Sequence, residues 1–491
     1  MTTSLSRRAL LAVGTLAAFP AAVLAQPVQP TLTLAKRSLE VNGKPASVFG
    51  ITGADGQPGL TLAPSARFAA TVQNRSGEAS IIHWHGQTPP PTQDGVADTG
   101  YANLIGNGLS RSYNFVPRTG THWMHSHHGL QEQLLMAAPM IVHTDYDLRL
   151  DAQEVVLLLH DFTFKNPLDI LASLTARGQQ GAMGSMSGMM GNGSSMAGMM
   201  GSAAGGMMSG GSMAGMSGMS GMGGMDLNDI DFDAYLANDR TLRDPQIVQA
   251  SPGDQVRLRL INGATATSFW IDLGALSGQL IAVDGNPVKP FMVRRFPLAG
   301  AQRTDILLRL PSAGAFPVLA QREGAREQTG LIIATPGTTI VKVAEQADTV
   351  SAPCSLNLEA QLTAVRPLPV RQPQRSYQVH LTGSMMGYDW GINGRQWANH
   401  QALTVRPGER VILDLINDTM MAHPMHLHGH HFQVMALNGT AVAGAMRDTV
   451  LVPPMGAVRI AFDADNPGRW LLHCHNLYHM AVGMMTEVVY V

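Results

Sequence analysis

The sequence predicts an all-β protein built from three Greek-key β-sandwich domains. Its 491 residues exceed what one compact core usually holds, and roughly 100–200 residues per domain suggest about three domains. Short runs of alternating apolar and polar residues recur along the chain, which is typical of half-buried strands. Long helical periodicity is scarce, so the strands are expected to pack against each other as sandwiches.

One strand unit recurs three times and defines the expected domains. It reads Arg67–Val72, Gln255–Asn262 and Arg410–Asn417, and each run follows a proline-containing turn and leads to an asparagine. Such internal repetition favours three similar units. We place the domains at residues 30–148, 149–345 and 346–491.

The N-terminus has the pattern of an export signal. Arg7 and Arg8 precede an apolar run that ends near Ala25, which predicts a twin-arginine signal peptide over residues 1–25, removed on export to the periplasm. An uncleaved membrane anchor is the alternative, but the run contains Pro20 and falls short of the ~20 apolar residues that a spanning helix needs. We expect the mature protein not to associate with membranes.

Residues 181–225 interrupt the strand pattern in the second domain. They are almost entirely Gly, Ser, Ala and Met and include fourteen methionines. Such a composition cannot bury enough apolar surface to fold alone, so we expect a disordered insertion. A plain flexible linker would explain the Gly and Ser, but thioether sulfur selects Cu(I), which favours a segment that collects soft metal ions.

Charge and cysteine content narrow the classes of partner. The chain has 33 basic and 35 acidic residues, and the net charge of -2 gives no field that would attract nucleic acid. The two cysteines could form a disulfide in an oxidising compartment. Cys474, however, lies between His473 and His475, where a thiolate can bind metal, and Cys354 is then left as a spare thiol. We expect a monomer.

Ten of the eighteen histidines fall into four clusters. A His-x-His pair on a strand sends both imidazoles to one face, because side chains alternate, and each pair can hold a metal ion from two points. The clustered histidines are His83, His85, His125, His127, His423, His426, His428, His473, His475 and His479.

The triplet His473-Cys474-His475 predicts two metal centres on one strand. Alternation turns the cysteine away from its two neighbours. A thiolate with two imidazoles and a weak thioether is the ligand set of a blue-copper electron-transfer centre. Cys474, His423 and His479 would be its strong ligands, and Met484 would be the axial ligand.

The four histidine motifs, in this order, resemble those of the multicopper oxidases, the family of laccases, bilirubin oxidases and bacterial copper-tolerance oxidases. The resemblance covers nearly the whole mature chain, and it implies cupredoxin-like domains and four copper ions: one type 1, one type 2 and two type 3. By that resemblance His83 and His426 would hold the type 2 ion. The type 3 ions would be held by His85, His125 and His475 on one side and by His127, His428 and His473 on the other.

The same resemblance implies a reaction. A substrate would give single electrons to the blue copper, and the three-copper cluster would reduce dioxygen to water. Asp94 matches the acidic residue that family members place near the cluster, although an aspartate before Gly95 also suits a simple turn. Many relatives have a carboxylate directly after the last blue-copper histidine, but this chain has Met480 there, which leaves part of the proton route undefined.

The substrate is expected to be Cu(I), with phenols oxidised as well. Copper-tolerance members of the family resemble this chain in their methionine-rich insertion and twin-arginine signal. Asp418, Met420 and Met421 precede His423 and would offer soft and anionic groups to Cu(I), although the methionines could simply pack around the copper.

Three other functions fit parts of this pattern. A laccase-like phenol oxidase is the nearest alternative. A copper-storing or copper-carrying protein would have no use for a thiolate wired to a histidine cluster, and a copper nitrite reductase does not require four His-x-His pairs. The histidines outside the ligand set are expected to be supporting or surface groups: His122, His128, His143, His160, His380, His400, His430 and His431.

Overall fold

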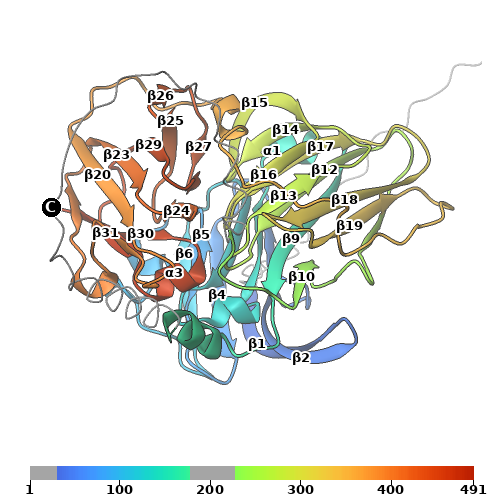
Figure 1. Ribbon diagram of the computed structural model, residues 1–491, viewed down its shortest axis with the longest axis horizontal. Helices are drawn as coiled ribbons and strands as arrows, with labels where there is room; N and C mark the ends of the chain where they lie inside the picture. The colour runs from blue at the N-terminus through green and yellow to red at the C-terminus, as the bar shows by residue number, and fades with distance from the viewer. Residues whose placement is uncertain (1–29, 177–226) are drawn as a thin grey trace, which may run out of the picture.

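The computed structural model describes residues 30–176 and 227–491 (Figure 1). The expected signal peptide and the methionine-rich segment lie outside these residues. The described chain is mainly β-structure, arranged as six sheets that form three two-sheet sandwiches. The predicted fold class, three cupredoxin-like Greek-key sandwiches, is confirmed.

The first sandwich packs a sheet of order β2-β1-β4-β6 against a sheet of order β3-β8-β7-β5. Buried side chains from both sheets, including Phe68, Trp84 and Met124, form its core. The strands are β1 Thr31–Val41, β2 Lys44–Thr52, β3 Leu60–Leu62, β4 Phe68–Arg75, β5 Ile82–His85, β6 Ser110–Phe115, β7 Gly120–Ser126 and β8 Ala137–Val142.

The second sandwich packs a six-stranded sheet, β10-β9-β12-β17-β14-β15, against a five-stranded sheet, β11-β19-β18-β13-β16. The strands are β9 Gln153–Phe162, β10 Ala234–Ala237, β11 Ile247–Gln249, β12 Gln255–Asn262, β13 Phe269–Asp272, β14 Gly278–Val283, β15 Asn286–Val293, β16 Arg295–Leu298, β17 Arg303–Arg309, β18 Ala315–Arg322 and β19 Gln328–Ala334.

The third sandwich packs a seven-stranded sheet, β21-β20-β23-β29-β25-β26 with β27 paired to β25, against a five-stranded sheet, β22-β31-β30-β24-β28. The strands are β20 Arg375–Thr382, β21 Gly391–Ile392, β22 Leu403–Val405, β23 Arg410–Asn417, β24 His423–Leu427, β25 Phe432–Leu437, β26 Thr440–Ala441, β27 Met446–Arg447, β28 Thr449–Val452, β29 Ala457–Asp463, β30 Arg469–Cys474 and β31 Met485–Tyr490.

Short helices join the strands. They are α1 Asp145–Arg149, a helix over residues 167–176, α3 Leu477–Ala481 and the 3-10 helices η1 Pro91–Gln93, η2 Gln131–Leu134, η3 Glu359–Gln361 and η4 Trp397–Asn399. Within the described part of the chain, none of the helices has the length and apolar character needed to cross a bilayer.

The repeated strand unit occupies the same place in each sandwich. β4, β12 and β23 each run parallel to the first strand of their sandwich and antiparallel to the next neighbour in the sheet. The predicted repeat is therefore confirmed as a structural repeat.

The asparagine at the end of each repeat closes a corner of the sandwich. The Asn74 amide donates to the carbonyls of Glu78 and Ile105, both at 2.7 Å. Asn262 donates to the carbonyls of Thr267 and Leu298 at 2.9 and 3.0 Å. Each of these amides also accepts a hydrogen bond from the backbone N–H two residues later. A buried amide saturated in this way fixes the loop after the strand.

Asn417 closes the corresponding loop in the third sandwich, and this loop leads to the predicted metal ligand His423. Its amide donates to the carbonyls of Met421, Val452 and Pro453 at 2.6, 3.1 and 2.9 Å. The segment that these bonds hold leads directly into His423 at the start of β24.

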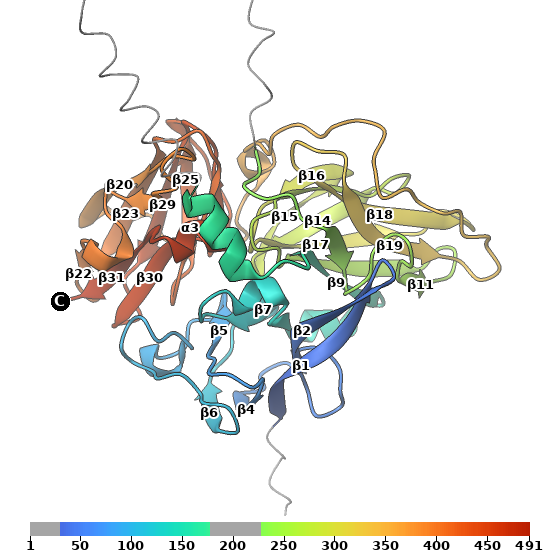
Figure 2. The ribbon, with the colours of Figure 1, turned by 60° about the horizontal axis from the view of Figure 1, so that its bottom comes forward.

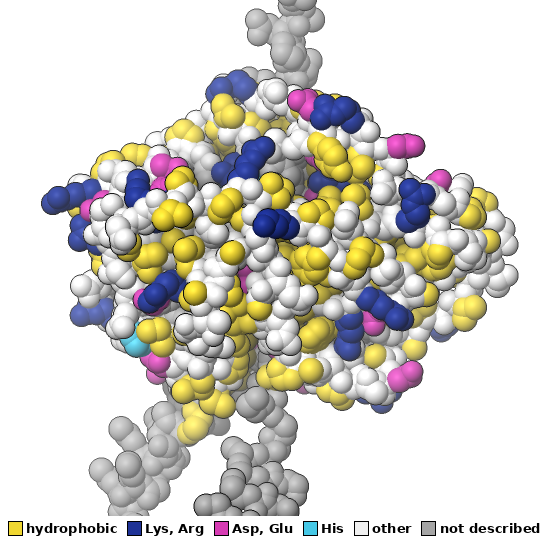
Figure 3. Space-filling view, turned by 90° about the horizontal axis from the view of Figure 1, so that it is seen from above, with side chains coloured by type: hydrophobic (Ala, Val, Ile, Leu, Met, Phe, Trp, Pro, Cys, Tyr) yellow, Lys and Arg dark blue, Asp and Glu magenta, His cyan; other side chains and the backbone are white. Residues whose placement is uncertain are grey.

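The three sandwiches meet around a common centre. Figure 2 shows the first sandwich (blue to cyan) beneath the other two, with the second (green to yellow) beside the third (orange to red). On the face drawn in Figure 3, basic and acidic side chains are scattered among neutral ones, as the near-zero net charge suggests.

Replacing Asn262 with Ala should destabilise the second sandwich by about 1–3 kcal/mol, because buried carbonyls would lose their donors. Thermal unfolding followed by calorimetry measures this, with Asn103→Ala, a change at an exposed asparagine, as the matched control. An unchanged melting transition for Asn262→Ala would show that the corner does not hold the loop.

Candidate metal centres

Strand register brings the first two histidine pairs together. β5 pairs antiparallel with β7, which sets His83 directly opposite His125 and His85 opposite Trp123. The turn that follows β5 presses on it closely: a Cβ on Gly95 (φ +81°) would lie 1.7 Å from the Ile82 carbonyl oxygen. Glycine is therefore required after Asp94.

The other two clusters meet in the third sandwich in the same way. β24 pairs antiparallel with β30, which sets His426 opposite His473 and Met425 opposite Cys474. Side chains alternate along both strands, so the imidazoles point to one face of the sheet. The apolar and sulfur side chains point to the other face.

The two halves face each other across the boundary between the first and third sandwiches. The imidazole of His83 lies 3.9 Å from that of His428, between ring centroids, and His85 lies 3.8 Å from His426. Contacts at 5.0 to 5.3 Å join His85 to His475 and His127 to His473. Eight predicted ligands therefore converge from two chain segments, residues 83–127 and 426–475, which are 299 positions apart.

The imidazoles of this cluster direct unpartnered nitrogens inward. In His85 the buried Nδ1 has no hydrogen-bond partner. In five others the buried Nε2 has none: His83, His125, His127, His426 and His475. The remaining two, His428 and His473, bring their Nε2 atoms to 3.0 Å. Buried nitrogens left without partners are costly unless something else binds them, and the set fits metal ions.

The opposite ring nitrogens are held by the protein. His83 Nδ1 lies 3.0 Å from the Asp94 carbonyl, and His426 Nδ1 lies 2.9 Å from the Asp448 carbonyl. Such contacts fix the tautomer and the ring orientation. Burial, followed by the neighbouring imidazoles, holds the pKa of His125 and His428 well below the usual range. The rings are therefore neutral, as metal binding requires.

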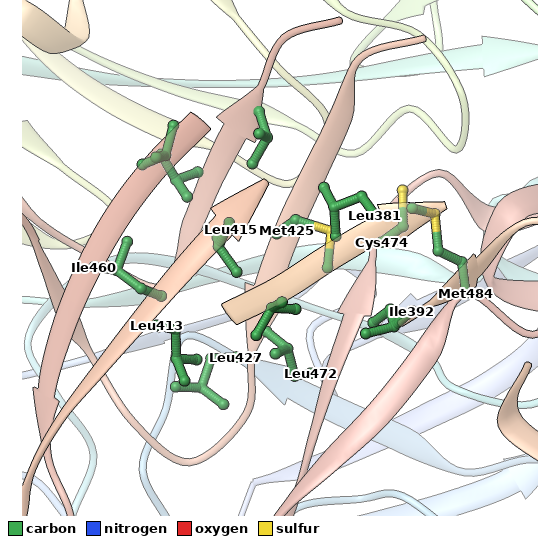
Figure 4. Close-up of a cluster of buried hydrophobic side chains, with 14 of the residues drawn as sticks. Leu381, Ile392, Leu413, Leu415, Met425, Leu427, Ile460, Leu472, Cys474 and Met484 are labelled. Atoms are coloured by element: carbon green, nitrogen blue, oxygen red, sulfur yellow. The ribbon is translucent and has the colours of Figure 1, made fainter. Parts of the chain in front are cut away.

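A second, separate group forms around the cysteine. Cys474 Sγ lies 3.7 Å from Nδ1 of both His423 and His479, and these two nitrogens are 3.2 Å apart. Met484 is fully buried and its carbonyl accepts the Cys474 N–H at 3.1 Å. Figure 4 shows the Met484 side chain beside Cys474 in the core of the third sandwich. This donor set fits a blue-copper centre.

β30 and the residue after it thus serve both groups. The sulfur of Cys474 belongs to one, while His473 and His475 belong to the other. The Cys474 carbonyl also lies 2.9 Å from His473 Nδ1, which adds a hydrogen-bonded route to the covalent one.

Asp94 lies beside the histidine cluster. Its Oδ2 is 2.9 Å from His428 Nδ1, while its buried Oδ1 has no hydrogen-bond partner. It also ends η1 and precedes Gly95, so it occupies a turn as well. The two interpretations of the sequence are compatible, and its part in catalysis stays a prediction.

Sequence reasoning missed Glu132. This carboxylate lies in η2, is buried, and places Oε2 at 2.8 Å from His125 Nδ1 and Oε1 at 4.0 Å from His475 Nδ1. Burial, followed by the charge of Asp161, raises its pKa well above the usual value. The only hint in the sequence was a polar triplet, Gln131–Gln133, inside an otherwise apolar stretch.

Asp448 was missed as well. Its Oδ1 lies 3.1 Å from His85 Nε2, and both of its oxygens accept from the buried guanidinium of Arg303 at 2.7 and 2.5 Å. Although Asp448 could be counted with His85 and His426 as a metal-binding group, this ion pair makes it a residue that orients His85. The second sandwich thereby reaches the cluster through Arg303.

Asp229 makes the equivalent contact at the cysteine group. Its Oδ2 lies 2.8 Å from His479 Nε2 and accepts from the Tyr388 hydroxyl at 2.9 Å and from Asn476 at 3.1 Å. Burial acts to raise the pKa of Asp229, but His479 and the other donors lower it overall. A carboxylate at this position fixes the His479 ring with Nδ1 toward the sulfur.

The remaining predicted residues are placed as follows. Asp418 is partly exposed and pairs with His380 at 2.7 Å, Met420 is 62% exposed, and Met421 is buried. Both ring nitrogens of His430 and of His431 have partners in the protein, as expected of supporting groups. Cys354 is buried and forms no disulfide.

Comparison with known proteins identifies the class. Family models described as multicopper oxidase match residues 33–147, 153–343 and 370–491. The chain is 31% identical to the multicopper oxidase MmcO of Mycobacterium tuberculosis, over 98% of this chain and 91% of that protein. It is 26% identical to a copper resistance protein A homolog of Pseudomonas syringae pv. tomato, over 96% and 95% of the two chains. The chain belongs to the multicopper oxidases.

Solved structures agree on the fold. Fet3p, described as a multicopper oxidase that functions in iron import, aligns with a TM-score of 0.74 over 94% of this chain and 90% of its own, at 17% identity. CueO from Ochrobactrum sp. aligns with a TM-score of 0.67 over 94% and 96%, at 19% identity. The protein is an oxidoreductase of this family, and copper is its cofactor.

Replacing Asp229 with Asn should weaken copper retention at the cysteine centre by about 10–100-fold, because the negative charge that orients His479 is lost. The measurement is the decay of the blue absorption of the copper-loaded protein during titration with a chelator. Asp231→Asn, a change at an exposed aspartate two residues away, is the control. Equal decay in the two variants would assign Asp229 no such part.

Proposed function

We propose that this multicopper oxidase oxidises Cu(I) to Cu(II) in copper tolerance, accepts phenols as further substrates and reduces dioxygen to water. The observation that carries the proposal is the pair of donor groups joined by β30. A sulfur-centred group suited to single electrons lies one residue from an eight-histidine cluster suited to several metal ions. A protein that only stores copper gains nothing from this connection.

The proposed ligands are those that the family resemblance implies. Cys474, His423 and His479 would hold a type 1 ion, with Met484 axial. His83 and His426 would hold the type 2 ion. The type 3 pair would be held by His85, His125 and His475 and by His127, His428 and His473. Four copper ions per chain follow from this assignment.

Bound copper supplies one-electron transfer at the sulfur centre and dioxygen reduction at the cluster. The protein supplies the rest. The backbone at Cys474 links the two centres. Asp229 orients His479 in the sulfur centre, and Asp448 orients His85 in the histidine cluster. Burial excludes bulk water from both. We assign Asp94 a proton-holding part at Oδ1, since this oxygen is buried without a hydrogen-bond partner and lies 3.4 Å from His83 Nδ1, while Oδ2 contacts His428.

Glu132 is the second acid that this proposal uses. Many relatives have a carboxylate directly after the last blue-copper histidine, whereas this chain has Met480 there. Glu132 approaches His125 and His475 from the first sandwich instead. In this proposal the carboxyl group of Glu132, in the connection between β7 and β8, takes the place of the one that Met480 lacks.

The choice of Cu(I) rests on soft donors near His423 and on relatives named copper resistance protein A. Met420 is exposed and Met421 lies two residues before the histidine, so thioethers flank this edge of the sulfur centre. We further propose domain boundaries near residues 148 and 345, a monomeric state, and a periplasmic location reached by the twin-arginine route.

Oxygen uptake with Cu(I) and with a phenol, compared side by side, tests the function. Both should support uptake with dioxygen reduced to water, and Cys474→Ser should abolish the blue absorption and reduce the rate by at least about 10³-fold, because the link between the centres is lost. Dioxygen reduction that survives in Cys474→Ser would overturn the proposal.

Deleting residues 181–225 should raise the KM for Cu(I) and leave that for a phenol unchanged or lower, because the fourteen thioethers that attract soft metal are removed. The matched control keeps the segment but replaces its methionines with leucine, which separates the thioethers from segment length. Equal losses for both substrates would reject a metal-collecting segment.

A further inference from the structure

A cavity of about 290 Å³ borders all three sandwiches. The first sandwich contributes Arg118 and Thr119, and the second contributes the turn between β14 and β15. Arg366 comes from the connection between the second and third sandwiches, and Met446 begins β27 of the third. Within residues 30–176 and 227–491, the charged side chains of this lining are the two arginines, and no carboxylate borders the cavity.

Arg118 lacks a direct counter-charge. Its side chain is partly buried, and Nη2 donates to the neutral acceptor Asn286 Oδ1 at 3.0 Å. In the described part of the chain no carboxylate forms an ion pair with it, since Asp448, which attracts it from farther away, pairs with Arg303. Burial, offset only in part by Asp448 and Asp465, lowers the pKa of Arg118. Cationic groups withdrawn from water are normally paired, so this guanidinium is open to a further partner.

Arg366 is exposed, and its backbone is fixed at the edge of the cavity. The Val365 N–H donates to the Pro287 carbonyl at 3.1 Å, and the Thr363 carbonyl accepts from the Lys289 N–H at 2.8 Å. The guanidinium of Arg366 forms no ion pair or hydrogen bond with another described residue. Two unpaired guanidinium groups at one cavity repel each other, and an anion between them replaces this repulsion with attraction.

The wall of the cavity is held in place by close backbone contacts. Gly120, at the start of β7, has φ +119°, and a Cβ there would lie 2.5 Å from Gly285 Cα, so the first and second sandwiches touch beside Thr119. The Arg118 N–H donates to Gln87 Oε1 at 2.7 Å, and the Arg118 carbonyl accepts from Gln87 Nε2 at 3.3 Å. A ligand therefore meets an ordered cavity and loses little affinity to ordering it.

We propose that this cavity binds a tetrahedral oxyanion of the class of inorganic phosphate, held between the guanidinium groups of Arg118 and Arg366. Guanidinium groups suit oxyanions because two parallel N–H groups can donate to two oxygens at once. The bound ion joins the first sandwich to the connection that leads into the third. The site is separate from the copper centres and does not depend on which substrate the protein oxidises.

Hydrogen bonds connect the cavity to the histidine cluster. Asn286, which accepts from Arg118, lies with Nδ2 2.7 Å from His431 Nδ1. His431 Nε2 lies 2.8 Å from the Gly86 carbonyl, and Gly86 directly follows His85. An anion that holds Arg118 in place thereby also holds the segment that carries a predicted copper ligand, so binding should stabilise the assembled protein.

Isothermal titration calorimetry with inorganic phosphate tests the site on the copper-loaded protein at constant ionic strength. Wild type should bind a single phosphate per chain. Arg366→Gln and Arg118→Gln should each weaken this binding at least about tenfold, because a charged donor is lost. Arg309→Gln is the matched control, since Arg309 is exposed at the end of β17 and does not line the cavity, and it should bind phosphate as wild type does.

No saturable phosphate binding by wild type would overturn the site. An unchanged affinity in Arg366→Gln would also overturn it and would place the ion at the copper centres instead. Because Arg366 is exposed, its variant keeps the fold and carries the test if Arg118→Gln does not fold.

Thermal unfolding gives a second measurement. Saturating phosphate should raise the Tm of wild type by about 2 °C or more over chloride at equal ionic strength, because the ion binds the folded state. The Tm of Arg366→Gln should not respond in this way. Equal shifts in the two proteins would show a general salt effect and contradict the site.

Discussion

Neighbouring side chains on β30 point to opposite faces, and this alternation governs the rest of the molecule. It sends Cys474 toward His423 and His479 and leaves His473 facing His428. The two candidate metal-binding groups are therefore joined by a few covalent bonds of one strand. In the proposed function, an electron that reaches the sulfur can pass to the histidine cluster without a conformational change.

The same geometry forces the cluster to be shared. β30 and the residue after it present only one pair of imidazoles. The neighbouring β24 and the residue after it add His426 and His428, so the remaining nitrogens must come from another sheet. The first sandwich supplies them from β5 and β7. A metal cluster divided in this way requires the first and third sandwiches to be held in fixed register.

Buried ion pairs supply that register. Arg303 of the second sandwich pairs with Asp448 of the third and donates to the Thr121 carbonyl of the first at 3.3 Å, so it connects all three. Arg447 of the third sandwich lies 3.2 Å from Asp284 and 2.8 Å from Glu359. Removing one partner of such a pair costs about 3–5 kcal/mol, because a buried charge is left uncompensated. Since Asp448 also contacts His85, the packing of the sandwiches and the orientation of a cluster histidine depend on one network.

Much of the fold and of the metal-binding groups could be predicted because the signals are local. A His-x-His pair and a period-two strand are visible within a few residues, and the structure brings the ten histidines into two groups. Asp229 and Asp448 could not be predicted, since each acts on a histidine that the chain brings close only through sheet packing. Asp229 and His479, for example, are 250 positions apart. Glu132 is only seven residues from His125, but its contact depends on the turn through η2, which the strand pattern does not determine.

The second sandwich shows what this division allows. It provides none of the proposed resident ligands, yet Arg303 and the nearby Asp229 orient His85 and His479, the former through Asp448. Residues of the second sandwich that do not contact these histidines need not keep metal-ligand geometry, so their contacts can be adapted to a substrate. Asp229 acts on the cysteine group through His479, whereas the Arg303–Asp448 pair acts on the histidine cluster through His85. The packing of the second sandwich therefore helps to set the orientation of an imidazole in each of the two groups.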